Sequence, residues 1–181
     1  MRKVFFQMFV SADGFIDGPN GAWDIDWHVI GEGFQDYVTE MLGSIDGILL
    51  GRKTYEGFAQ FWPNSTDPEA DAMNALTKFV FSNTLGSANW RNSRLMKGDA
   101  AAEVRKLKAE DGKDLALFGS NDLAASLAAQ GLIDEYRFFV NPVILGGGTS
   151  VLRGIKDRIN LKLLSAKPLW SGVVLLTYAP A

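Results

Sequence analysis

The chain has 181 residues, and its 18 Lys and Arg against 21 Asp and Glu give a formal net charge of −3. With 47% hydrophobic and 22% charged residues, the composition supports a buried core and suits one compact domain. The acidic balance excludes the electrostatic footprint of a nucleic-acid-binding protein. The absence of cysteine excludes disulfides and thiolate chemistry, and the single histidine, His28, excludes a multi-histidine metal centre.

No segment has the pattern of a membrane span or of an export signal. The apolar stretch over residues 4–10 is too short for a signal peptide, and no run approaches the ~20 apolar residues of a spanning helix. We therefore expect a cytoplasmic protein with no membrane partner and no metal site.

The first part of the chain alternates strands and helices around one long loop. In chain order we predict a strand over residues 4–10, a loop rich in Gly, Asp and Trp over 11–32 and a helix over 33–43. A buried strand over 45–50 and the start of a second helix over 54–58 follow. Loops as long as the first one are usually binding loops or lids.

The same alternation continues through the middle of the chain. We predict strands over 78–81 and 115–118, a helix from Asp99, which caps it, to about residue 110, and an alanine-rich helix over 121–130. Gly131 closes that second helix. Repeated strand–turn–helix units favour an α/β fold with a mainly parallel sheet.

The last fifty residues change character. Short apolar runs without a helix between them predict strands over residues 135–140, 143–145, 161–167 and 173–178. The last pair is typical of an antiparallel hairpin at a sheet edge. The sequence thus predicts a single three-layer α/β domain over residues 1–181, with a mainly parallel central sheet and an antiparallel C-terminal hairpin.

Three strand ends carry the residues most suited to ligand binding. Gly51, Arg52 and Thr54 follow one strand, Ser82 and Asn83 follow the next, and Gly119 and Ser120 lie between a strand and a helix. Because ligands of open α/β sheets bind at the carboxyl ends of strands, these junctions predict a phosphate or pyrophosphate site. Each could also be an ordinary turn or helix cap, and no GxGxxG follows the first strand.

The order of these motifs resembles the dihydrofolate reductase-like superfamily. The segments over residues 11–18, 46–56, 82–84, 119–120 and 131–135 carry the resemblance, which covers nearly the whole chain. It is most similar to stand-alone relatives of the C-terminal reductase domain of the bifunctional riboflavin-biosynthesis deaminase/reductase. Its most specific pieces are residues 51–56, and residues 131–135 followed by 141–142 and 145–148.

The resemblance implies NADPH as cofactor and hydride transfer to a pyrimidine- or pteridine-like heterocycle. It places the cofactor phosphates and riboses at Gly51, Arg52 and Thr54, and the adenine ribose phosphate at the segment of Ser82 and Asn83. Gly119 and Ser120 match the pyrophosphate turn. The family's habit, together with apolar late strands, also implies a homodimer.

The substrate side departs from the riboflavin reductases, since Phe58 stands about where they place an aspartate and no arginine occurs between Arg52 and Arg91. Dihydrofolate reductases instead hold the ring with a carboxylate on the first helix. Asp36 is our candidate for that catalytic group, with Glu32 and Glu40 as alternatives one turn away.

The remaining candidates concern the ring of the substrate. Trp27 and Trp62 are predicted to stack on it, and Asp13 follows the first strand near the expected nicotinamide. His28 lies in the long loop and is a weaker candidate. The leading hypothesis is an NADPH-dependent reductase of a heterocycle. The alternative is a non-catalytic protein that keeps the nucleotide site and lacks the substrate chemistry.

Overall fold

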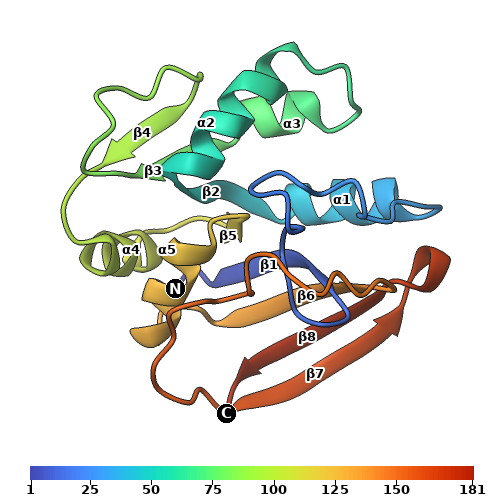
Figure 1. The fold of residues 1–181 in the computed structure, drawn as a ribbon. Coiled ribbons are helices and arrows are strands. Elements are labelled where there is room, and N and C mark those ends of the chain that lie inside the picture. The colour runs from blue at the N-terminus through green and yellow to red at the C-terminus, as the bar shows by residue number, and fades with distance from the viewer.

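Eight strands form one continuous sheet in the computed structural model, which describes residues 1–181 (Figure 1). The strands are β1 (Val4–Ser11), β2 (Ile45–Gly51), β3 (Thr77–Phe81), β4 (Ser93–Met96), β5 (Asp114–Phe118), β6 (Glu135–Asn141), β7 (Leu161–Pro168) and β8 (Val174–Pro180). Their order across the sheet is β4-β3-β2-β5-β1-β6-β8-β7. The strands from β4 to β6 in this order are parallel, and only β8 and β7 run against their neighbours.

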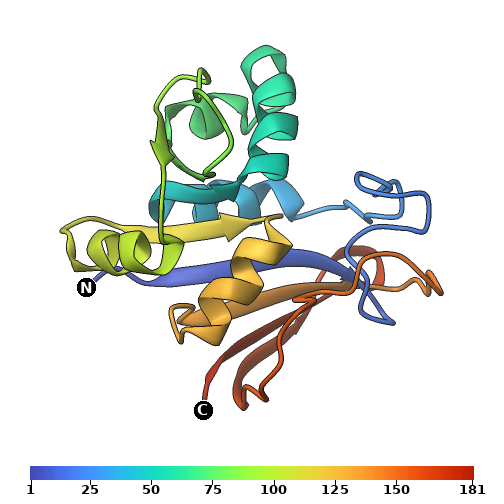
Figure 2. The same cartoon turned by 60° about the vertical axis from the view of Figure 1, so that its left-hand side comes forward.

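Helices cover both faces of this sheet. They are α1 (Phe34–Gly43), α2 (Arg52–Phe61), α3 (Ala70–Ala75), α4 (Ala100–Ala109) and α5 (Asn121–Ala129), with short 3₁₀ turns η1 (Trp62–Asn64) and η2 (Trp170–Gly172). Helices α4 and α5 lie on one face, and α1, α2 and α3 lie on the other (Figures 1 and 2). The predicted three-layer α/β fold, mainly parallel with an antiparallel C-terminal hairpin, is confirmed.

Side-chain alternation along the strands divides the core in two. On the α4 and α5 face, Phe6 and Leu117 pack against helix residues such as Val104 and Leu127. On the other face, the neighbouring strand positions, Phe5 among them, pack against the apolar side of α1. Because successive residues of a strand point to opposite faces, each central strand contributes to both halves.

Three details differ from the prediction. The strand expected over 143–145 is wrong, because this segment bonds to the loop after β1: Ala12 N donates to Val143 O, and the Asp13 carboxylate accepts from the backbone N–H of Leu145 and Gly146. Helix α3 and strand β4 were not predicted, since both are short and lack a clear apolar period. Helix α2 begins at Arg52, directly after β2.

The helix ends follow ordinary capping chemistry. Asp99 accepts a hydrogen bond from Ala101 N at the start of α4, as predicted, and Gly131 closes α5 with a φ of 65°. None of the helices is both long and apolar enough to cross a bilayer.

Candidate functional site

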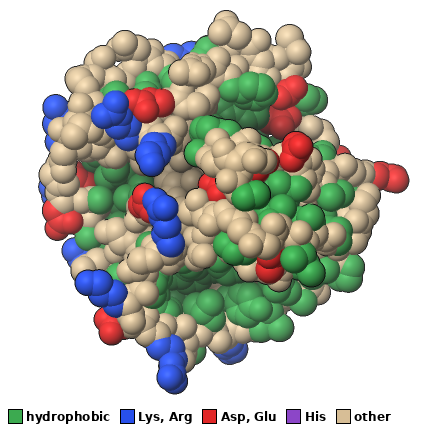
Figure 3. All heavy atoms as spheres, in the orientation of Figure 1, with side chains coloured by type: hydrophobic (Ala, Val, Ile, Leu, Met, Phe, Trp, Pro, Cys, Tyr) green, Lys and Arg blue, Asp and Glu red, His purple; other side chains and the backbone are tan.

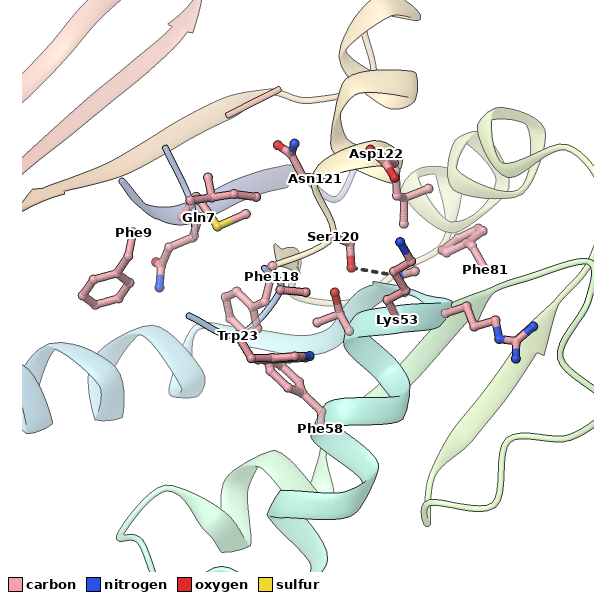
Figure 4. A pocket seen from close by; sticks show the side chains of 18 of the residues that line it. Gln7, Phe9, Trp23, Lys53, Phe58, Phe81, Phe118, Ser120, Asn121 and Asp122 are labelled. Carbon is pink, nitrogen blue, oxygen red and sulfur yellow. Dashed lines mark hydrogen bonds between the residues drawn. The ribbon is translucent and has the colours of Figure 1, made fainter. Parts of the chain in front are cut away.

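A cleft of about 930 Å³ opens at the carboxyl ends of β2, β3 and β5, beside β1 (Figure 4). It is lined by all seven residues that the sequence predicted for the cofactor, namely Gly51, Arg52, Thr54, Ser82, Asn83, Gly119 and Ser120. The topology explains why they meet. Parallel strands end at the same edge of a sheet, so junctions far apart in the chain lie side by side.

Two helix N-termini meet at the centre of the cleft. Neither α2 nor α5 has a side-chain cap, and Ser120 Oγ accepts a hydrogen bond from Gly51 N at 2.8 Å, which ties the two starts together (Figure 4). Uncapped N-termini direct free backbone N–H groups and the positive ends of their helix dipoles outward. The pair is therefore suited to bind a pyrophosphate.

Glycine at position 119 is required by the backbone and by its neighbour. Gly119 has a φ of 60°, and a Cβ there would lie 3.1 Å from Cγ2 of the buried Thr54. A larger residue would strain the turn and press on α2. The turn between β5 and α5 thus stays narrow enough for the two helix starts to approach.

Arg52 extends from the start of α2 toward the turn after β3. Its guanidinium donates to Thr84 Oγ1 at 2.9 Å and to Glu56 Oε1 at 2.7 Å. Asn83 Oδ1 accepts from Gly98 N at 2.7 Å, which leaves the amide N–H₂ of Asn83 as a donor. Arg52 and the donors after β3 therefore lie at one end of the cleft, as the sequence indicated.

An ion pair borders the start of α5. Arg153 donates to both carboxylate oxygens of Asp122, at 2.9 and 3.1 Å. Arg153 lowers the pKa of the Asp122 carboxyl, mainly through this hydrogen bond, so Asp122 is ionised at neutral pH. Lys53 also lines the cleft, so this end presents three cations to a ligand, two of them already paired with carboxylates.

The other end of the cleft is apolar. Its walls come from β1, α1, α2 and η1, with Phe9, Val38, Met41, Phe58 and Trp62 among the lining residues. In Figure 4 the Trp23 ring lies beside that of Phe58, and the two ring centroids are 6.3 Å apart. We call this end the ring compartment.

Trp23 reaches the compartment because α2 has a glycine beneath it. A Cβ on Gly57 would lie 2.3 Å from Cζ2 of Trp23, so the indole packs directly on the helix backbone. Trp23 comes from the long loop between β1 and α1 and is 52% exposed. The loop therefore covers part of the cleft, which agrees with the interpretation that it is a binding loop.

The predicted substrate residues divide into one that lines the cleft and three that do not. Trp62 lines it, whereas Trp27 packs edge-on against His28 and donates to Asp24 O. Asp13 is exposed and holds residues 145–146, and Asp36 is exposed on α1. The expected position of Asp36 against the ring is thus not observed, because Val38 and Met41 occupy the cleft side of that helix.

His28, which the sequence marked as a weak candidate for the site, lines the cleft. Its ring stacks on Phe9 at 4.6 Å between centroids, and its Nε2 is buried without a hydrogen-bond partner. Burial lowers the pKa of His28 to about 4, so the imidazole is neutral at physiological pH.

Gln7 is a cleft residue that the sequence analysis missed. It lies on β1 and lines the cleft with Phe9, two residues further along the same strand face (Figure 4). A signal was present, since Gln7 is a polar residue inside an otherwise apolar strand. Lys53 was likewise not among the predicted site residues.

Comparison with known proteins gives one family across the chain. The model of the RibD C-terminal domain matches residues 2–175. The uncharacterized protein YyaP of Bacillus subtilis is 34% identical over 98% of this chain and 94% of its own.

Solved structures share the fold at low sequence identity. A putative riboflavin biosynthesis protein from Shewanella sp. PV-4 aligns with a TM-score of 0.79 at 21% identity, over 99% of both chains. Dihydrofolate reductase from Enterococcus faecalis, solved with NADP(H), aligns with a TM-score of 0.64 at 13% identity, over 98% of this chain and 96% of its own. The fold is therefore dihydrofolate reductase-like.

Proposed function

The chain belongs to the RibD C-terminal domain family, and on that premise we propose that it is an NADPH-dependent reductase of a pyrimidine- or pteridine-like heterocycle. The observation that carries the proposal is the joining of two uncapped helix N-termini to an apolar compartment within one cleft. A dinucleotide needs the helix N-termini, and a flat ring needs the apolar compartment. We further propose that residues 1–181 act as one domain of this family.

The residues at the sheet edge fit the cofactor. The backbone N–H groups at the starts of α2 and α5 would hold the pyrophosphate, with Gly51, Thr54, Gly119 and Ser120 shaping the turn. NADPH, when bound, supplies a hydride. Arg52 would bind the extra ribose phosphate together with the donors of Ser82 and Asn83, because a guanidinium and a phosphate match in charge and geometry.

The ring compartment would align the substrate with the cofactor. Phe58 and Trp62 provide flat apolar walls, and Trp23 closes the side that faces the long loop. Such walls exclude water and restrict a planar ring to few orientations, which favours transfer through proximity and orientation. β1, α1 and α2 place no carboxylate in the compartment, and the carboxylates of Asp17, Glu69 and Asp122 line the cleft from other segments. We propose that the proton comes from water at the mouth of the compartment.

A non-catalytic nucleotide-binding protein is the second candidate. The observation that favours it is that the predicted carboxylate, Asp36, lies outside the cleft. The resemblance to the riboflavin reductases also puts Phe58 about where they place an aspartate. Such a protein would bind NADPH without oxidising it in the presence of any ring.

Two measurements test the proposal in order. Quenching of tryptophan fluorescence during titration with NADPH reports binding, because Trp23 and Trp62 line the cleft. Loss of NADPH absorbance in the presence of a panel of dihydropterins, pteridines and aminopyrimidines then reports turnover. Binding with turnover supports the reductase, binding without turnover of any ring supports the second candidate, and no binding refutes both.

A further inference from the structure

One polar side chain faces the ring compartment from the sheet, and its orientation is determined by the residues behind it. Gln7 lies on β1 in register with Phe118, the last residue of β5, and with Arg137 on β6. It is therefore one strand beyond the Gly119 turn, where a dinucleotide crossing β3, β2 and β5 would end. The geometry points to Gln7 as the residue that selects the substrate ring, an inference that rests on the proposed function.

Tyr37 on α1 holds the Gln7 amide from behind. The phenol Oη of Tyr37 lies 2.7 Å from Gln7 Oε1. Burial raises the pKa of the Tyr37 phenol, and the charge and hydrogen bond of Arg137 only partly oppose that rise, so the phenol keeps its proton at neutral pH. A protonated phenol has one hydrogen to donate and can also accept.

The positive charge of Arg137 favours one orientation of that phenol. A guanidinium has donors only, so a phenol under its influence turns its oxygen lone pairs toward the cation and its hydrogen away from it. Arg137 is itself fixed, since its Nε donates to Glu135 at 2.5 Å and its guanidinium lies 3.8 Å from the centre of the Phe5 ring. The phenol hydrogen is then left for Gln7.

The consequence is a fixed amide. Because Gln7 Oε1 accepts from Tyr37, the amide nitrogen Nε2 is the end that remains, and it has no hydrogen-bond partner within the protein. In Figure 4 the Gln7 side chain projects into the cleft beside Phe9. Tyr37 thus orients Gln7 so that the amide presents a neutral N–H donor to the compartment.

A neutral donor selects a different ring from a carboxylate. It pairs with a carbonyl oxygen or an unprotonated ring nitrogen, whereas a protonated amino-heterocycle needs an anionic acceptor. β1, α1 and α2 supply no Asp or Glu to the cleft lining, and its three carboxylates, those of Asp17, Glu69 and Asp122, come from other segments. The substrate class indicated is accordingly a neutral oxo-heterocycle whose carbonyl accepts from Gln7 Nε2.

Two probes of equal shape test this selection, 2,4-dioxopteridine and 2,4-diaminopteridine. Their dissociation constants are measured by calorimetry at neutral pH, with and without saturating NADP⁺. We expect the wild-type protein to bind the dioxo ring about 10-fold more tightly, a ratio that corresponds to about 1.4 kcal/mol. Gln7→Glu should reverse the order, because the carboxylate accepts from the amino groups and repels the carbonyl.

Tyr37→Phe separates positioning from folding. Without the phenol the amide can turn over and offer either end, so the ratio should fall by at least about threefold while the dioxo ring still binds. Gln60→Glu is the matched control, since it adds the same charge on an exposed position of α2 that does not line the cleft, and it should leave the ratio unchanged.

The outcomes distinguish this inference from the proposed function. An unchanged ratio in Gln7→Glu, or no binding of either ring to any of these proteins, overturns the role of Gln7, whatever happens to NADPH. Failure to bind NADPH, with the ratio and its reversal intact in the cofactor-free protein, refutes the reductase and leaves Gln7 as the ring-selecting residue.

Discussion

Replacing Arg52 by alanine tests where the cofactor's ribose phosphate binds. The guanidinium reaches the turn after β3 through Thr84, and Ser82 and Asn83 lie at the same end of the cleft. NADPH and NADH differ only in the phosphate that this group would bind. Arg52→Ala should therefore weaken NADPH and leave NADH nearly unchanged.

The size of the effect follows from the exposure of the side chain. A hydrogen bond to a charged group contributes about 1.5–3 kcal/mol, whereas a fully exposed ion pair contributes about 0.2–1 kcal/mol. Arg52 is 48% exposed, and the Glu56 carboxylate at 2.7 Å competes for it. We therefore expect about 1.5 kcal/mol, which corresponds to a roughly 10-fold weaker binding of NADPH.

The assay is the fluorescence titration with each dinucleotide in turn. Arg158→Ala is the control, because Arg158 is exposed and does not line the cleft. Its two dissociation constants should match those of the wild-type protein. Equal losses for NADPH and NADH in Arg52→Ala would show that Arg52 does not bind the ribose phosphate, and no loss for either would place the phosphate elsewhere.

Three further predictions use other features of the structure. Gly57→Ala should raise the melting temperature, because alanine favours a helix by about 1 kcal/mol over glycine. It should also weaken the binding of ring probes at least about threefold, because the new Cβ displaces Trp23, whose ring lies 2.3 Å from that position. Unchanged probe binding in calorimetry would contradict a role for Trp23. The folded-state pKa of His28, about 4, lies below the ordinary histidine value of 6.5. The unfolded chain therefore binds more protons between these two values, and the free energy of unfolding falls as the pH falls through that range. His28→Phe should remove about 1–3 kcal/mol of that loss of unfolding free energy, after allowance for the partial exposure of His28. Urea titrations of both proteins at pH 6.5 and 4 measure the difference. An identical pH dependence in both proteins would refute the prediction. We propose a homodimer through the edge strand β7, where Leu163 is 52% exposed. Hydrophobic side chains gather on the lower part of the surface in Figure 3. Leu163→Lys should convert the dimer to a monomer in sedimentation, and a monomeric wild-type protein would contradict the dimer.

The sequence alone was enough to predict the fold class and the residues that meet at the end of the cleft where we propose the cofactor. Short apolar runs ending in Gly51, Ser82 and Gly119 predicted parallel strands, and such strands end at one edge whatever their order. No tertiary information was needed to place these junctions together. That is why all seven predicted cofactor residues line one cleft.

The errors were local and have local causes. The apolar segment over 143–145 has the composition of a strand, but its backbone groups pair with the loop that carries Asp13. Asp36 lies outside the cleft lining, and the same period that predicted its helix places Val38 and Met41 on the buried side.

Only the tertiary structure decided the ring compartment. Strand alternation puts Phe5, Gln7 and Phe9 on one face of β1, but it does not say which face α1 covers. Packing of α1 on that face brings Tyr37 to Gln7 and leaves the amide nitrogen toward the cleft. A short-range pattern fixes where along the chain an element begins and which side chains share a face. The polar contact that orients Gln7 joins residues thirty positions apart, and only the packing of the whole chain brings them together.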